Sequence, residues 1–172
     1  MMAKIILDEH SEAKVSLYYK YLSIYLNVLA RSPIQKIYLV DFFCGEGLYE
    51  NEGKGSPIVA LECIRNHYES NNKTCPDIKI IFNDSGYSEI ESGVLKIDRV
   101  KKIAKGIFSP PNVEIAYSKT DYQQLVKQVI TRANQLLPSE RALFFIDPWG
   151  YKEIKPDEIK SLLDLNYIRK KL

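Results

Sequence analysis

The chain has 172 residues, of which 45% are hydrophobic and 27% are charged. This length and composition predict a single globular domain and exclude collagen-like, low-complexity and wholly disordered chains. The net charge of +2 gives no general electrostatic support for a nucleic-acid partner. The apolar runs are too short for a secretion signal or for the ~20 residues of a membrane span, so we expect a cytoplasmic protein with no membrane association.

The cysteines predict neither a metal site nor a disulfide framework. Cys44, Cys63 and Cys75 form no C-x-x-C pair, and the chain has only two histidines. Structural zinc sites need four such ligands at close spacing. An odd number of cysteines without a secretion signal is typical of a reducing compartment.

Helical and strand patterns alternate along the chain. Apolar residues at spacings of three and four predict a helix over 11–30, capped by Ser11, within a segment 1–32 that precedes the sheet. Apolar runs predict four strands, and helical spacing follows each of them. The predicted strands are 36–43, 79–84, 112–117 and 142–147, and the helices that follow them are 57–68, 90–100, 125–137 and 156–163.

This alternation predicts an α/β fold with a Rossmann-like parallel sheet, in strand order 3-2-1-4, with helices on both faces. In that order the first and fourth strands are neighbours, and ligands bind at the carboxyl ends of such neighbours. The fourth strand would form an open edge, which is a surface through which two copies could pair as a homodimer.

The first strand leads into a glycine-rich loop. Asp41 ends the apolar run, and Cys44-Gly45-Glu46-Gly47 follows. The loop is neither a complete G-x-G-x-x-G motif, because Glu50 replaces the third glycine, nor a P-loop. Glu46 would repel a pyrophosphate, whereas a ligand with a cation and hydroxyl groups would suit it. S-adenosylmethionine therefore fits this loop better than NAD or ATP, and the alternative is a purely structural turn.

Three further polar residues are cofactor or loop candidates, each with a structural alternative. Asp84 would meet the ribose hydroxyls or cap the turn that follows it. Asp121 would meet an adenine amino group or cap the next helix, and the cap is the more common role. Ser56 precedes Pro57 and suits the start of a helix beside the loop.

The fourth strand runs into Asp147-Pro148-Trp149-Gly150-Tyr151. Asp147 and the Pro148 carbonyl would accept hydrogen bonds from an amino group, and Trp149 or Tyr151 would stack on a flat substrate. This arrangement indicates methyl transfer to an amine of a base or a side chain, which mainly requires positioning. The alternative is a turn whose aromatic residues pack in the core.

His10 and Lys14 lie four residues apart near the start of the first helix. They are candidates for the substrate or loop side of the site. From the spacing alone, a solvated helix start is the favoured alternative.

Four segments together resemble the bacterial three-Cys-motif partner (TcmP) family. They are His10–Lys14, Val40–Tyr49, Gly55–Pro57 and Ile146–Tyr151. The resemblance implies a class I S-adenosylmethionine-dependent methyltransferase fold, with Asp41, Gly45 and Gly47 along the cofactor loop and Asp147, Pro148 and Trp149 on the substrate side. Trp149 stands where the Asp-Pro-Pro-Tyr pattern of amino-methyltransferases has its second proline.

The same resemblance implies a partner and a longer sheet. The family's name refers to an associated protein whose three-cysteine motif is similar to radical S-adenosylmethionine enzymes, and the cysteines of this chain are not that motif. The family fold adds strands five to seven, so we expect residues 1–172 to form a partial, truncated domain. The sequence thus leaves two functions open, a methyltransferase and a non-catalytic partner module, while a dinucleotide oxidoreductase is disfavoured by the loop.

Overall fold

A computed structural model describes residues 5–70, 75–107, 110–148 and 154–165. Helix α1 (Glu9–Leu29) precedes the sheet. The remaining elements alternate in the order β1 (Lys36–Asp41), α2 (Ser56–Ser70), β2 (Asp77–Asn83), α3 (Lys96–Ala104), β3 (Val113–Ser118), α4 (Tyr122–Ala133), β4 (Glu140–Phe145) and α5 (Pro156–Leu163).

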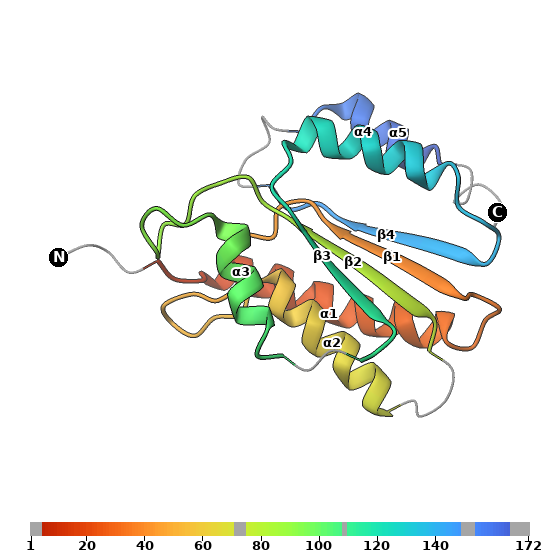
Figure 1. Ribbon diagram of the computed structural model, residues 1–172, viewed down its shortest axis with the longest axis horizontal. Helices are drawn as coiled ribbons and strands as arrows, with labels where there is room; N and C mark the ends of the chain where they lie inside the picture. Colours follow the sequence, from red (N-terminus) through yellow and green to blue (C-terminus); the bar gives the residue numbers. More distant parts are fainter. Residues whose placement is uncertain (1–4, 71–74, 108–109, 149–153, 166–172) are drawn as a thin grey trace.

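The four strands form one parallel sheet in the order β3-β2-β1-β4, as predicted (Figure 1). In the two strand pairs that β1 forms, Asp41 at the end of β1 lies opposite Phe82 of β2 and Phe145 of β4. The strands therefore end at one edge of the sheet, and the loops that follow them meet there.

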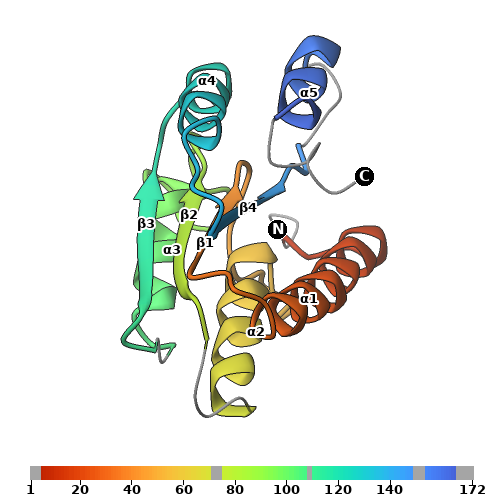
Figure 2. The same ribbon diagram turned by 90° about the vertical axis from the view of Figure 1, so that its right-hand side faces the viewer.

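Helices cover both faces of the sheet, which confirms the predicted α/β architecture. Figure 2 shows α1, α2 and α3 on one face and α4 and α5 on the other. The first face holds the larger apolar core, in which Leu22, Leu26 and Ile64 pack against Ile37 and Ile80. The second core is smaller and contains the fully buried Phe42. The apolar β1 run, buried on both sides, is what a doubly covered parallel strand requires.

The predicted cap of the first helix is wrong. Helix α1 begins at Glu9, and its N-cap is Asp8, whose Oδ1 accepts a hydrogen bond of 2.7 Å from the Ser11 backbone N–H. Asp is as good a cap as Ser, and the helix begins two residues earlier than predicted. Its first turns lie at the edge where the strands end, because Ser11, Lys14 and Val15 line the cavity there.

The predicted helix over 90–100 is also wrong in its first half. Helix α3 begins only at Lys96. Before it, Gly93 adopts a positive φ of 76°, and Tyr87 and Leu95 form an antiparallel bridge. A residue with a left-handed backbone conformation cannot continue a right-handed helix, so Ile90 and Val94 lie in the loop despite their helical spacing. Helix α4 likewise ends at Ala133 rather than near Leu137.

Candidate functional site

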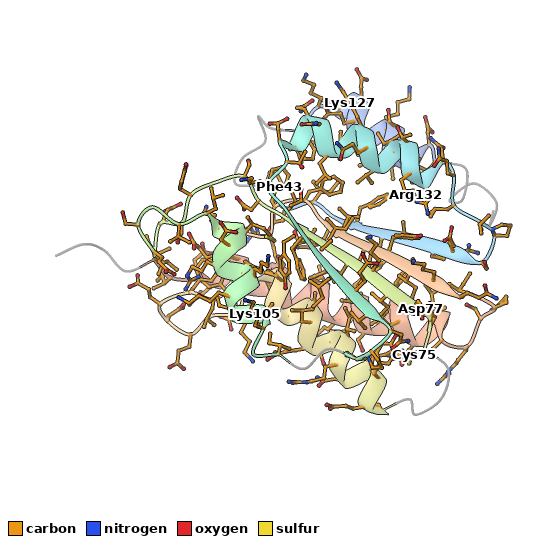
Figure 3. The ribbon with its side chains drawn as sticks, viewed as in Figure 1. Phe43, Cys75, Asp77, Lys105, Lys127 and Arg132 are labelled. Carbon is orange, nitrogen blue, oxygen red and sulfur yellow. The ribbon has the colours of Figure 1, made fainter. Side chains whose placement is uncertain are left out.

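A cavity of about 500 Å³ lies at the edge where β1 and β4 end. In Figure 3, Phe43 marks this edge, while Asp77 marks the opposite edge, where β2 begins. Four parts of the chain line the cavity: the segment 5–15, the loop after β1, the loop after β2 and the residues after β4. This is the crevice that the strand order predicts.

Asp41 is not among the residues that line this cavity, and its predicted contact with a cofactor stays a prediction. Its side chain is 1% exposed. The Ser56 hydroxyl donates a 2.6 Å hydrogen bond to Oδ2, and the Phe43 backbone N–H donates a 3.3 Å bond to Oδ1. Burial, with a smaller contribution from the nearby carboxylates of Asp84 and Asp147, raises the pKa of Asp41 to about 7, although the hydrogen bonds from Ser56 and Phe43 act in the opposite direction. Asp41 therefore ties the strand end to the start of α2.

The two loop glycines have different roles. Gly45 lines the cavity at a φ of +65°, and an added Cβ there would meet only the Tyr49 hydroxyl, at 3.3 Å. Gly47 has a φ of +77°, but its Cβ would lie 3.0 Å from Val100 Cγ2, so it packs against α3 instead. Of these two glycines, Gly45 lines the cavity, and a cofactor contact of Gly47 stays a prediction.

Asp84 caps the turn that follows it, and its contact with ribose hydroxyls stays a prediction. Its Oδ1 accepts a 2.8 Å bond from the Gly86 N–H, which closes the turn, and its Oδ2 accepts a 3.0 Å bond from the Gly45 N–H. The residue also lines the cavity. Each carboxylate oxygen has a second lone pair, so Asp84 retains acceptor capacity toward a ligand.

Glu46 lines the cavity, but its carboxylate is also bound by groups of the protein itself, so its predicted role toward a ligand stays a prediction. It is 3% exposed, and its carboxylate accepts bonds from the Ser88 hydroxyl at 2.7 Å and the Glu89 N–H at 2.8 Å. Arg99 Nη1 lies 3.6 Å from the same carboxylate and donates to the backbone carbonyls of Glu46 and Leu48 at 2.5 and 2.6 Å. Glu46 therefore fixes the loop to the segment before α3.

Asp147 and Lys14 meet across the cavity. Lys14 Nζ lies 2.8 Å from Asp147 Oδ1, and both residues line the cavity together with Pro148. Lys14 lies in the second turn of α1, which begins at Glu9. His10 does not line the cavity. Trp149 and Tyr151 lie outside the described residues.

Asp121 has the helix-capping role that the sequence favours, and its adenine contact stays a prediction. Its Oδ1 accepts bonds from the backbone N–H groups of Gln123 and Gln124, so it caps α4, and it does not line the cavity. Cys44 lines the cavity but is buried, and burial raises the pKa of its thiol well above the ordinary value. A protonated thiol is a poor nucleophile, so Cys44 contributes shape rather than reactivity.

Sequence reasoning missed Asn83 and Arg99. Asn83 is buried; its Nδ2 donates to the Phe42 carbonyl at 3.1 Å, and its Oδ1 accepts from the Thr120 N–H at 3.0 Å. It thus joins the ends of three neighbouring strands. An amide at the end of an apolar strand was the available signal for Asn83. No local pattern marks Arg99, because its partners are more than 50 residues away.

A strap formed by residues 5–8 closes one wall of the cavity. The Leu7 N–H donates to Asn51 Oδ1, and Asn51 Nδ2 donates back to the Leu7 carbonyl, both at 3.1 Å. This pair of bonds attaches the strap to the loop between β1 and α2. The wall therefore depends on two segments that are 44 residues apart.

Comparisons with known proteins give little more than a distant likeness of shape. No family model matches the chain, and no curated protein matches it. Among solved structures, the chain is similar to "Loganic acid methyltransferase with SAH", with 15% sequence identity and a TM-score of 0.34. The similarity covers 62% of this chain and 28% of that one, so the chain matches less than a third of that protein's length.

Two searches of the described residues concern other kinds of site. No helix among them is both long enough and apolar enough to cross a membrane. Within the same residues, no group of three or more His, Cys, Asp and Glu side chains is arranged to hold a metal ion.

Proposed function

We propose that the chain binds S-adenosylmethionine in the cavity at the ends of β1 and β4 and belongs to a methyltransferase that acts on an amine. The observation that carries this proposal is the composition of that one cavity. It has Gly45 and Asp84 on one side and Asp147 with Pro148 on the other. Its volume of about 500 Å³ lies within the usual range for small-molecule sites.

The residues present suit a cationic ligand with hydroxyl groups. Five carboxylate residues line the cavity, namely Asp8, Glu46, Asp84, Glu89 and Asp147, against two cationic residues, Lys14 and Lys96. Gly45 leaves an open cradle beside the Asp84 carboxylate. Bound there, S-adenosylmethionine would supply a methyl group on a positively charged sulfur. Asp84 would accept hydrogen bonds from its hydroxyls, and the Gly45 backbone would border it.

On the other side of the cavity, Asp147 would hold the acceptor amine. Its carboxylate accepts a hydrogen bond from an ammonium already, that of Lys14. The amine would first release a proton to water, its lone pair would then attack the methyl group, and S-adenosylhomocysteine would leave. The contribution of these residues would therefore be orientation.

Replacing Gly45 by Ala tests the cofactor cradle, and Gly93→Ala is its matched control. Both glycines have a positive φ, of 65° and 76°, but an added Cβ at Gly93 meets nothing within 4 Å. Both variants should lose about 1–2 kcal/mol of unfolding free energy from left-handed strain. Only Gly45→Ala should weaken S-adenosylmethionine binding, by about tenfold or about 1.4 kcal/mol, as measured by calorimetric titration. Equal affinities for the two variants would contradict the assignment of the cradle.

A partner-docking module is the second candidate function, and an exposed apolar stripe on α1 favours it. Leu17, Tyr21, Ile24 and Val28 recur at spacings of four, three and four, and each is between 54% and 68% exposed. Stripes of this kind are common at protein interfaces. The stripe belongs to the helix that contacts β4, since the Tyr25 hydroxyl donates to the Ala142 carbonyl at 3.3 Å. Among the described residues, β4 pairs on one side only. We propose a second copy of this chain as the occupant of this surface.

The charge variant Ile24→Glu tests this second candidate. Sedimentation velocity of the wild-type chain should show a concentration-dependent dimer, and Ile24→Glu should abolish it, because a carboxylate would be buried unpaired in the interface. Lys20→Glu, on an exposed position beside the stripe, should leave the dimer largely intact. A wild-type chain that stays monomeric at every concentration would rule out self-docking through α1.

A further inference from the structure

The ion pair between Lys14 and Asp147 identifies a place in the cavity where an ammonium group binds. Lys14 Nζ and Asp147 Oδ1 are 2.8 Å apart, and their side chains are 37% and 31% exposed. The two residues are 133 positions apart in the sequence. The contact therefore depends on the fold of the sheet edge, and it brings a primary amine into the same cavity as Gly45 and Asp84.

The electrostatics of the cavity favour a cation at this place even without Lys14. The other lining cation among the described residues, Lys96, has its Nζ 3.6 Å from Glu89 Oε1. Glu46 faces Arg99. If Lys14 moved away, no other cation among the described residues that line the cavity would be paired with the Asp147 carboxylate. A carboxylate in a partly enclosed cavity attracts a replacement cation, since its environment screens less than bulk water does.

The walls beside the pair are apolar. Val15 and Phe145 also line the cavity, and Phe145 stacks on Tyr18 with ring centroids 4.1 Å apart. An alkyl chain that ends in an ammonium, like the Lys14 side chain itself, would place its methylene groups on such a surface while its charge reaches Asp147.

We propose that the subsite at Asp147 binds alkylammonium groups, such as the side chain of a lysine or a small primary amine, and that Lys14 occupies it when no such ligand is present. The idea that such an amine is the methyl acceptor rests on the proposed function. The idea that an alkylammonium group binds at Asp147 rests only on the ion pair. Lys14 thereby acts as an internal competitor, and an external amine binds only to the fraction of molecules in which Lys14 has left.

Titration with n-butylammonium chloride, followed by NMR chemical shifts at constant ionic strength, tests this inference. Lys14→Met keeps an unbranched apolar side chain and removes the charge, so it should bind n-butylammonium about fivefold more tightly than wild type, the range expected for a partly exposed ion pair. Adding Asp147→Asn to Lys14→Met should abolish the binding. Lys14→Gln provides a second charge-free variant should Lys14→Met fold poorly.

Lys54→Met is the matched control. Lys54 Nζ also lies 2.8 Å from a carboxylate, that of Glu62, but neither residue lines the cavity. This variant should bind n-butylammonium as the wild type does. Cytosine, a flat neutral amine, should not compete with n-butylammonium for Lys14→Met.

The outcomes separate this inference from the proposed function when S-adenosylmethionine is titrated in parallel. Equal n-butylammonium affinities for wild type and both Lys14 variants, or preferential binding of cytosine, would overturn the inference, even if S-adenosylmethionine binds. An n-butylammonium response that depends on Asp147 without any S-adenosylmethionine binding would support the inference and contradict the proposed function.

Discussion

The wild-type chain should lose about 4 kcal/mol of unfolding free energy, relative to Asp41→Asn, as the pH rises from about 4 to about 8. Burial raises the pKa of Asp41 from the ordinary value of 3.8 to about 7. Between these values the unfolded chain has released the proton, whereas the folded chain retains it. The stabilisation is therefore complete below pH 3.8 and is lost as the pH rises through about 7.

Urea denaturation at closely spaced pH values measures this effect. The Asn side chain does not titrate, so the difference between the two proteins should change through this range and level off above pH 7 to 8. Asp121→Asn, which alters an exposed helix cap, should keep the wild-type pH profile. Parallel profiles for wild type and Asp41→Asn would show that the Asp41 carboxyl is ionised in the folded protein.

Replacing Arg99 by Ala should lower the unfolding free energy by about 3–5 kcal/mol, since it leaves a buried charge without its partner. The Arg99 side chain is 12% exposed and faces the Glu46 carboxylate. Its Nη1 also donates hydrogen bonds to the backbone carbonyls of Glu46 and Leu48. These carbonyls belong to the loop that borders the cavity. The substitution should therefore also weaken S-adenosylmethionine binding, and calorimetric titration of the folded fraction would measure that loss.

Arg65→Ala is the matched control for this prediction. Arg65 pairs with Glu69 one turn along α2 at 4.0 Å, and the Glu69 side chain is exposed. Such helix-surface pairs contribute about 0.5 kcal/mol or less. If Arg99→Ala changed stability as little as Arg65→Ala does, the loop would not depend on the Arg99 network.

The sequence predicted the sheet well because its signals are local and repeated. Each strand is a short apolar run, each helix has three- and four-residue spacing, and alternation of the two restricts the topology to a few parallel arrangements. The errors occurred where one residue overrides a periodic pattern. Gly93 interrupts the spacing from Ile90 to Val100, and Asp8 rather than Ser11 begins the first helix.

The site was only partly predictable, because the chemistry of a polar side chain depends on its distant neighbours. Gly45, Asp84, Asp147 and Lys14 were all candidates, and the structure brings them to one cavity. The sequence could not show that Glu46 points toward Ser88 and Arg99, because these residues lie about 40 and 50 positions away. Nor could it show that Lys14 reaches Asp147, since the spacing alone favoured a solvated helix start.

Calorimetric titration of the purified chain with S-adenosylmethionine and S-adenosylhomocysteine, with NAD and ATP as controls, tests the central claim most directly. The account predicts that the first two ligands bind with one site per chain and that binding weakens in Gly45→Ala. It predicts no binding of NAD or ATP, because the loop lacks the third glycine of a dinucleotide motif and the features of a P-loop. A folded chain that binds neither S-adenosyl compound, or that binds NAD in preference, would contradict it.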